Sequence, residues 1–382
     1  MKLHGRTSLY EFLGDLVVYR NLEPADRRLP GLQAAWREMG LAGPQVPRKA
    51  DPAYARTIVY LLRRAQALLD PATALKRLLY VGDTRLLDGT AYRNIQEASG
   101  WRGLAFIASE KLSEGPRMER EGTVFLANRW ALLGDFLSQA EGEGVAVGPG
   151  TAVVLDLDKT AFGARGRNDG AVDRARVDGV RETVAALLGP GFDQAAFDRA
   201  YGELNQPAYH AFTADNQDYL AYICLAIGAG MIGFEELLGA VRAGSLSDFA
   251  GFLARIEDQA ARAEPGLAAL HREIATRVAA GDPTPFKAFR RREYLATVAR
   301  LGSLADDAPD EVRLGEEILI TQEVREAALA VRERGALVFG LSDKPDEASF
   351  PDEAGRARGL AALHRTTTHA YGWSLGPPWG PG

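Results

Sequence analysis

The chain has 382 residues, of which 46% are hydrophobic and 25% are charged, as expected for a soluble globular protein with two domains, or with one domain and a large insertion. Its formal net charge of −6 argues against nucleic acid as a main partner, and its one cysteine rules out an intramolecular disulfide. No apolar segment reaches the roughly 18 residues of a membrane span, and the N-terminus does not resemble a signal peptide, so we expect a cytoplasmic protein that does not enter a membrane.

The first 150 residues are predicted to begin with helices and to continue as alternating strands and helices. Hydrophobic residues recur at helical spacing between residues 7 and 40, which predicts an N-terminal helical extension over residues 1–47. An amphipathic helix is expected from about residue 53 to 69. After it, apolar runs predict strands and periodic stretches predict helices at residues 78–83, 92–98, 103–108, 123–127 and 130–140.

The rest of the chain is predicted to hold a central strand, a long helical segment and a final strand. One apolar run begins at residue 152 and ends at Asp156, and residues 336–341 form another. Between these runs almost the whole sequence has helical periodicity and shows no internal repeat. The sequence therefore predicts an α/β core formed by residues 48–165 and by residues 331–382, the C-terminal tail included, with an all-helical insertion at residues 166–330.

Acidic side chains follow two of these predicted strands at the point where each strand ends. Asp156 and Asp158 close the run Ala-Val-Val-Leu, and Asp83, with Asp88 five residues later, closes the run Leu-Leu-Tyr-Val-Gly. Open α/β sheets bind their ligands at the carboxyl ends of parallel strands. Carboxylate oxygens are the ligands that Mg²⁺ prefers in proteins. These positions predict a divalent-metal site at one edge of a parallel sheet.

The residue types at these strand ends are those that phosphoryl transfer needs. A carboxylate beside Mg²⁺ can attack a phosphoryl group and form an aspartyl phosphate. A second carboxylate two residues later can protonate the leaving oxygen and then deprotonate the attacking water. A serine hydroxyl and a lysine ammonium can hold the phosphoryl oxygens as charge redistributes. A single Asp-x-Asp pair also occurs in metal-dependent glycosyltransferases and in ordinary turns, so the argument depends on the combination.

Four short segments together resemble the motifs of the haloacid dehalogenase (HAD) superfamily in its phosphatase form. Leu155-Asp-Leu-Asp-Lys-Thr160 is similar to the first motif, and Leu337-Val-Phe-Gly-Leu-Ser342 is similar to the second. Lys49-Ala-Asp-Pro52 is similar to the third motif, and Val81-Gly-Asp-Thr-Arg-Leu-Leu-Asp88 to the longer-spaced variant of the fourth. The resemblance covers residues 48–110, 150–165 and 325–365.

Membership of this superfamily would imply a Rossmann-like parallel sheet and a Mg²⁺-dependent phosphatase that acts through an aspartyl phosphate. By position, the resemblance makes Asp156 the nucleophile and Asp158 the acid/base, with Lys49 as a further catalytic residue. It implies phosphate binding by Ser342 and Thr160. It also implies that the metal is held by Asp156, Asp158, Asp83 and Asp88.

The order of the motifs departs from that of the superfamily, in which they run from first to fourth. In this chain the third and fourth motifs precede the first, and the second comes last, an order that a circular permutation would produce. The new termini would lie between the third strand and the helix that begins near Lys49, which is tolerable because domain termini usually lie at the surface. The helical segment lies where the superfamily inserts a cap, which would exclude water from the site.

The sequence leaves several alternatives open. Lys344 lies two residues after Ser342 and is an alternative to Lys49 as the phosphate-binding ammonium. Arg165 and Arg167 follow the first motif and are candidates for binding an anionic substrate. The expected activity is hydrolysis of a small phosphorylated metabolite; a phosphotransferase and a non-catalytic binding or scaffold protein with the same fold are the alternatives. The sequence indicates neither the substrate nor the oligomeric state.

Overall fold

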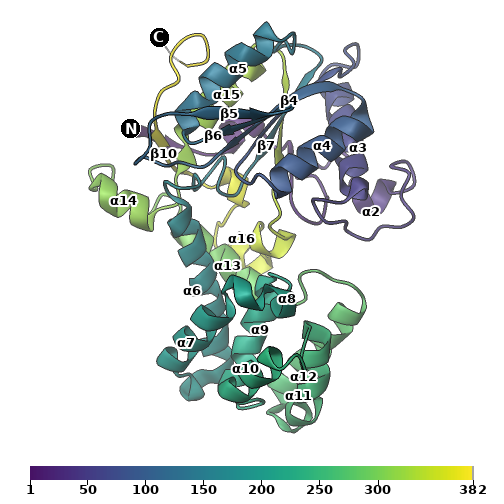
Figure 1. Ribbon diagram of the computed structural model, residues 1–382, viewed down its shortest axis with the longest axis vertical. Coiled ribbons are helices and arrows are strands. Elements are labelled where there is room, and N and C mark those ends of the chain that lie inside the picture. Colours follow the sequence, from purple (N-terminus) through teal and green to yellow (C-terminus); the bar gives the residue numbers. More distant parts are fainter. Residues whose placement is uncertain (381–382) are drawn as a thin grey trace. The chain divides into compact units, whose positions relative to one another are not determined.

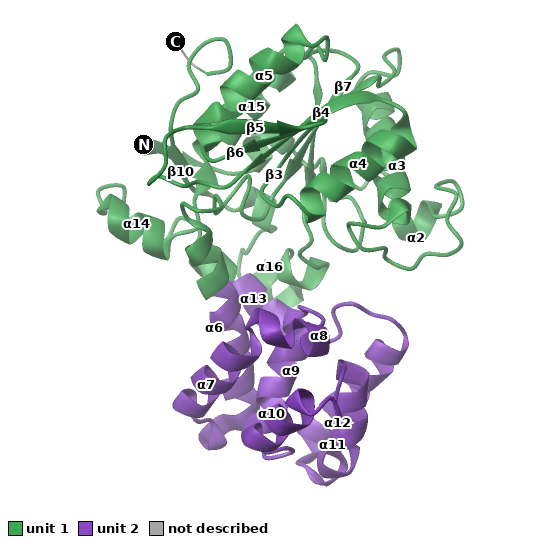
Figure 2. Cartoon of the chain, viewed as in Figure 1, with its two compact units in different colours: residues 1–174, 297–382 green, residues 175–296 purple. Residues whose placement is uncertain are grey.

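The computed structural model describes residues 1–380, which form two compact units (Figures 1 and 2). Unit 1 comprises residues 1–174 and the chain from residue 297 onward, and it contains both β-sheets. Unit 2 comprises residues 175–296. The chain enters unit 2 within α6 (Asp169–Leu188) and leaves it within α13 (Lys287–Ala299). Among the described residues, no helix is both long enough and apolar enough to cross a membrane.

Unit 1 is an α/β unit built on a seven-stranded mixed sheet with the strand order β2-β9-β7-β3-β4-β6-β5. The first six strands in this order run parallel to their neighbours, and the last pairs antiparallel with β6. The central strands are nearly continuous apolar runs because both of their faces are buried. The strands are β2 (Val17–Val18), β9 (Leu337–Leu341), β7 (Thr151–Asp156), β3 (Arg77–Gly82), β4 (Arg102–Ala108), β6 (Val124–Ala127) and β5 (Met118–Glu121).

Helices cover both faces of this sheet (Figure 1). On one face, α3 (Pro52–Leu69) and α4 (Leu87–Ser99) pack against a core that includes Tyr80 and Val154. On the other face lie α5 (Leu133–Gly142) and α15 (Gln322–Glu333), and the ring of Phe136 in α5 lies 5.4 Å from that of Phe106 in β4. Successive side chains of each strand therefore enter two different cores.

The predicted N-terminal helical extension is wrong. Residues 2–7 form β1 (Lys2–Thr7) of a second, three-stranded sheet with the order β1-β10-β8, and Val17–Val18 form the edge strand of the main sheet. The helical spacing near residue 10 yields only α1 (Tyr10–Leu13), because Gly14 follows with a φ of 59° and ends the helix. The main-chain oxygens of Leu16 and Val18 then accept hydrogen bonds from β9 and from the residue after it, which fixes this segment as a strand. The N-terminal segment also contains α2 (Leu32–Ala35). The other two strands of the three-stranded sheet are β8 (Ile320–Thr321) and β10 (Thr368–Gly372).

The predicted strands and helices between residues 52 and 156 are confirmed, with small shifts at their ends. The helical insertion is shorter than predicted, because residues 166–174 and 297–330 belong to unit 1.

Unit 2 has its own apolar core, which includes Leu225, Phe252 and Phe286. Its further helices are α7 (Gln194–Leu204), α8 (His210–Thr213), α9 (Gln217–Gly228), α10 (Phe234–Arg242), α11 (Phe249–Arg262) and α12 (Pro265–Ala279). Unit 1 also contains α14 (Asp310–Glu316) and α16 (Glu353–Ala357). Single 3₁₀ turns lie at Trp130–Leu132, Gly189–Gly191, Pro207–Tyr209, Asp346–Ala348 and Leu363–Arg365. The last two residues of the predicted C-terminal tail lie outside the described residues.

Candidate active site

The predicted site residues meet at the carboxyl edge of the main sheet. Asp156 is the last residue of β7, Asp83 directly follows β3, and Ser342 directly follows β9. Strand β7 lies between β9 and β3 and is parallel to both. All three strands therefore end at the same edge of the sheet, with Asp156 in the middle, as the sequence predicted.

Three buried carboxylates gather at the ends of β7 and β3. One oxygen from each of Asp83, Asp88 and Asp156 lies within 4.8 Å of the others. None of the three residues is more than 8% exposed. Like charges that are this close and this far from water are unfavourable unless cations compensate them.

Two cations face these three carboxylates. The Nζ atom of Lys49, which lies just before α3, is 2.5 Å from Oδ1 of Asp156 and 2.6 Å from Oδ1 of Asp88. The Nε atom of Arg165, in the loop after β7, donates a hydrogen bond to Oδ2 of Asp83. Lys49 is 6% exposed, and although its burial opposes a charge, the carboxylates of Asp156 and Asp88 hold the pKa of Lys49 well above its ordinary value.

The three carboxylates outnumber the two cations, and the ionised forms of two of the carboxylates are disfavoured. Burial raises the pKa of Asp83 to about 7, and the nearby charge of Asp88 contributes to this increase. Burial also raises the pKa of Asp156 well above its ordinary value, against the opposing effect of Lys49. Any further cation that binds beside such a group stabilises its ionised form and lowers its pKa.

Asp88 differs from the other two acids because hydrogen-bond donors already occupy both of its oxygens. Oδ2 accepts bonds from the main-chain nitrogens of Asp83 (3.1 Å) and Thr84 (2.8 Å) and from the Thr84 hydroxyl (2.7 Å). Oδ1 accepts a bond from the Tyr80 hydroxyl at 2.9 Å in addition to that from Lys49. Burial opposes ionisation, but Lys49 and Thr84 together lower the pKa of Asp88. Asp88 therefore positions the loop of Asp83 and the ammonium of Lys49.

These contacts refine the predicted metal site and add residues to it. Asp83, Asp88 and Asp156, all three predicted as ligands, each offer an oxygen to a shared cation. Asp88 also holds the loop of Asp83 and the ammonium of Lys49 in place. Tyr80 and Thr84 were not predicted to have a role, although a tyrosine within an otherwise aliphatic strand is a signal that a buried partner exists. Gly82 is required by the same packing, since a Cβ atom at this position would lie 2.6 Å from Cγ of Asp88.

A second group of side chains surrounds the predicted acid/base. The Ser342 hydroxyl donates a hydrogen bond of 2.5 Å to Oδ2 of Asp158 and accepts one of 3.1 Å from the main-chain nitrogen of Lys344. The Nζ atom of Lys344 lies 3.8 Å from Oδ1 of Asp158, and that oxygen is buried without a hydrogen-bond donor among the described residues. Asp158 was predicted as a metal ligand but does not belong to the carboxylate cluster. The acid/base role predicted for Asp158 stays a prediction.

The turn after Asp158 buries Thr160. Lys159 has a φ of 60°, and the backbone turns here. Thr160 is fully buried, and its carbonyl oxygen accepts a hydrogen bond from the Thr321 hydroxyl. The Thr160 hydroxyl has no hydrogen-bond partner among the described residues. The substrate-binding role predicted for Thr160 thus stays a prediction.

The two arginines after the first motif have different roles. Arg165 contacts Asp83, as described above, so it lies within the site. Arg167 is buried and forms ion pairs with Glu110 and, at 2.8 Å, with Glu323. The expectation that Arg167 contacts an anionic substrate is therefore wrong, because its guanidinium is already occupied by two buried carboxylates. The Glu110 main-chain nitrogen donates to the Arg165 carbonyl oxygen at 2.9 Å, which fixes the loop between the two arginines.

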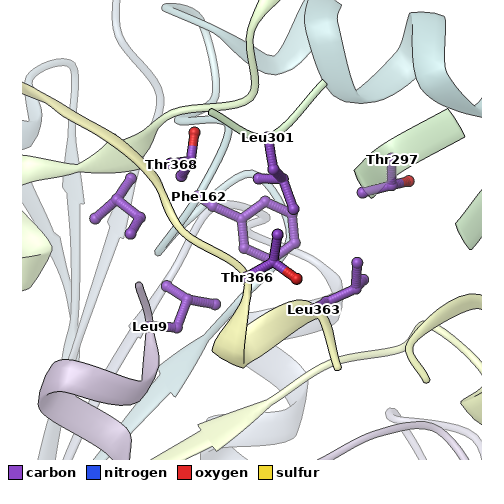
Figure 3. A pocket seen from close by; sticks show the side chains of 8 residues that line it. Leu9, Phe162, Thr297, Leu301, Leu363, Thr366 and Thr368 are labelled. Atoms are coloured by element: carbon purple, nitrogen blue, oxygen red, sulfur yellow. The ribbon is translucent and has the colours of Figure 1, made fainter. Parts of the chain in front are cut away.

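An apolar cavity elsewhere in unit 1 has no part in this chemistry (Figure 3). Figure 3 shows the ring of Phe162 among the side chains of Leu301, Leu363 and Thr366. No titratable side chain lines this cavity. Its lining indicates a packing imperfection beside the turn that carries Asp158.

The residues present fit a divalent cation on the evidence of charge and donor type. The candidate ligands are hard carboxylates, and three of them face only two cations. Comparisons with models of known protein families, with curated proteins and with solved structures found no match. The geometry of the site and the resemblance of its motifs therefore carry the interpretation of function.

Proposed function

We propose that the protein is a Mg²⁺-dependent phosphoric monoester hydrolase of the HAD type that acts through an aspartyl phosphate. One observation supports this most strongly: Asp156, at the end of the central strand, contacts the ammonium of Lys49 and lies beside Asp83. A nucleophilic carboxylate, a neutralising cation and a further carboxylate that can share a metal ion are the parts that this chemistry requires.

Each side chain has a defined task in the proposed reaction. When bound between Asp83 and Asp156, Mg²⁺ would neutralise charge on these carboxylates and on the phosphoryl oxygens. An oxygen of Asp156 attacks phosphorus, while the ammonium of Lys49 favours the ionised form of this carboxyl group against the effect of its burial and neutralises the developing charge. Asp158 protonates the leaving oxygen and then removes a proton from the water that cleaves the aspartyl phosphate.

Ser342 and Lys344 support the proton transfer and bind the phosphoryl group. The Ser342 hydroxyl is bonded to Asp158 and can turn to donate to a phosphoryl oxygen when Asp158 is protonated. The Nζ atom of Lys344, 3.8 Å from Oδ1 of Asp158, places a cation beside the proposed acid/base, where it can neutralise charge on the phosphoryl group. Arg165 is a further cation in the site and pairs with Asp83. A metal ion held by Asp83 would compete with Arg165 for this carboxylate.

The strand arrangement is compatible with a circularly permuted HAD core, with one change to the predicted break. Strand β2 lies beside β9, on the side away from β7, and precedes Lys49 in the chain. If β2 is the third strand of this core, the new termini lie before β2 and not between it and Lys49. Unit 2 is inserted in the chain between β7 and β9, where the superfamily inserts a cap.

An assay of phosphate release tests the proposal. Purified protein is incubated with a panel of phosphate monoesters in the presence of Mg²⁺, in the presence of EDTA, and as the Asp156→Asn variant. We expect Mg²⁺-dependent release that EDTA and the substitution both abolish. Substantial turnover by Asp156→Asn would exclude the nucleophile assignment. Release from no ester would favour a non-catalytic protein, and transfer to added alcohols would indicate a phosphotransferase.

A further inference from the structure

A polar cavity of about 290 Å³ adjoins Asp83 at the carboxyl ends of β3, β4 and β6. These three strands are adjacent and parallel, so the cavity lies along the same edge of the sheet as Asp156. Asp83 belongs both to the carboxylate cluster and to the cavity wall. The remaining lining residues are Arg85, Ile107, Ala108, Ser109, Lys111, Arg117, Glu119, Leu126, Ala127 and Asn128.

The charged residues of the cavity favour an anion. Arg85, Lys111 and Arg117 contribute three cations, and Asp83 and Glu119 contribute two carboxylates, of which Asp83 is assigned to the metal site. The carboxylates that pair with these cations lie 2.8–3.8 Å away, and every partner in these pairs is between 44% and 65% exposed. Exposed ion pairs of this kind contribute little free energy, so an anion that enters the cavity can replace the carboxylate partners.

Buried side chains hold the cavity wall in place. The Asn128 side chain accepts a hydrogen bond of 2.7 Å from the main-chain nitrogen of Arg117 and donates one of 2.8 Å to the carbonyl oxygen of Gly115. The guanidinium of Arg129 donates to the carbonyl oxygens of Lys111 and Glu114. Asn128 and Arg129 are 7% and 8% exposed. The loop that carries two of the three cations is thus ordered before any ligand binds, which lowers the entropic cost of binding.

We propose that this cavity is a subsite for a second anionic group on the leaving group of the substrate. The proposal rests on the proposed function, because it assumes that a phosphoryl group binds at Asp156. It narrows the substrate class to phosphate monoesters whose alcohol part carries a carboxylate or a second phosphate. Arg85, Lys111 and Arg117 are then specificity-determining residues, and they take no part in the bond-breaking step.

A matched pair of esters tests the subsite. 4-Carboxyphenyl phosphate and 4-carbamoylphenyl phosphate have leaving groups of the same size that differ in charge, and 1,4-phenylene bisphosphate adds the second phosphate as the alternative anion. For the wild type we expect kcat/KM to be about 10-fold higher for the carboxylate than for the amide, the scale of two half-exposed charge contacts. The Lys111→Ala/Arg117→Ala double variant should lose this preference, because kcat/KM should fall more for the carboxylate than for the amide.

Two further variants control the measurement. Arg120→Ala removes a cation from β5, the same strand that carries Glu119, but Arg120 pairs with Glu143 and does not line the cavity, so the preference should remain. Arg85→Ala removes the third cation of the cavity and should lower the preference on its own, which provides an independent test if the double variant does not fold. If kcat/KM relative to the amide is higher for the bisphosphate than for the carboxylate, the second anion of the substrate is a phosphate.

Binding of non-hydrolysable analogues separates the subsite from the proposed activity. Calorimetry with 4-carboxybenzylphosphonate and 4-carbamoylbenzylphosphonate should give the same preference, lost in the double variant. If this preference appears but no ester is hydrolysed, the subsite stands and the proposed hydrolase fails. If esters are hydrolysed with equal kcat/KM for both leaving groups, or if the preference persists in the double variant, the subsite is overturned and the hydrolase stands. If neither analogue binds and no ester reacts, both proposals fail.

Discussion

The Nζ atom of Lys49 lies 2.5 Å from Oδ1 of Asp156, although 107 positions separate the two residues in the chain. The sequence left two lysines as candidates for the ammonium that neutralises the phosphoryl group. Lys344 lies instead 3.8 Å from Asp158, next to Ser342. The geometry therefore associates Lys49 with Asp156, the proposed nucleophile, and Lys344 with Asp158, the proposed acid/base.

The two lysines should differ in their contribution to catalysis. Lys49→Ala is expected to lower kcat/KM by about 2–4 kcal/mol, the scale of one preorganised electrostatic contact at a reacting centre. Lys344→Ala should cost clearly less. Steady-state kinetics on one reactive ester gives both values, and thermal unfolding shows whether either variant has lost its fold. A larger loss for Lys344→Ala would transfer the role to Lys344 and leave Lys49 as a structural residue.

Asp158 should matter most for esters with poor leaving groups, because its proton stabilises the departing oxygen. For an alkyl phosphate, Asp158→Asn is expected to lower kcat about 10²- to 10⁴-fold. For 4-nitrophenyl phosphate the loss should be smaller, since nitrophenolate departs without a proton. Comparison of the two esters in wild type and variant is the measurement. An equal loss for both would indicate that Asp158 acts on the water step or on the structure of the site.

Mg²⁺ affinity should decrease as the pH falls below about 7. In the metal-free protein the pKa of Asp83 is raised to about 7 by burial and by Asp88, and the metal binds the ionised carboxylate. Below this pH the ion must displace a proton, so binding weakens and protons are released. Titration calorimetry at several pH values, in two buffers with different ionisation enthalpies, measures both effects. Asp83→Asn should bind Mg²⁺ more weakly and show a shallower pH dependence, with the remainder due to Asp156, whose pKa burial also raises; an unchanged dependence would exclude Asp83 as its source.

Gly82→Ala should destabilise the protein and disturb the metal site. The added Cβ atom would lie 2.6 Å from Cγ of Asp88, whose side chain is fixed by five donors and cannot move away without losing them. A cost of about 1–3 kcal/mol in the free energy of unfolding is expected for such overpacking. Gly89→Ala in α4 is the matched control, because its nearest atom is Nη1 of Arg93, 3.5 Å away at the end of a flexible side chain. Chemical denaturation of both variants tests this, and equal stabilities would contradict the packing argument.

The strands that carry Asp83, Asp156 and Ser342 were predictable because a buried strand is a local feature of the sequence. Both faces of β3, β7 and β9 are covered by helices, so each strand appears as an apolar run that ends where its polar residues begin. The carboxyl ends of adjacent parallel strands meet at one edge of the sheet, and this rule placed the acidic residues together. The N-terminal strands β1 and β2 were missed for the opposite reason. Their sequences do not alternate or form long apolar runs, and they exist through hydrogen bonds to strands more than 300 residues away.

By itself, the sequence determined that acidic residues end two buried strands, and that a long helical segment lies between β7 and β9 in the chain. Only the tertiary structure decided which charges meet. It paired Lys49 with Asp156, used both oxygens of Asp88 as acceptors, and enclosed Arg167 between two buried carboxylates. The physical reason is that strand and helix periodicities depend on neighbours along the chain, whereas ion pairs depend on the strand order and on the path of the loops. Charged side chains leave little local pattern, and their partners become known only when the whole sheet is assembled.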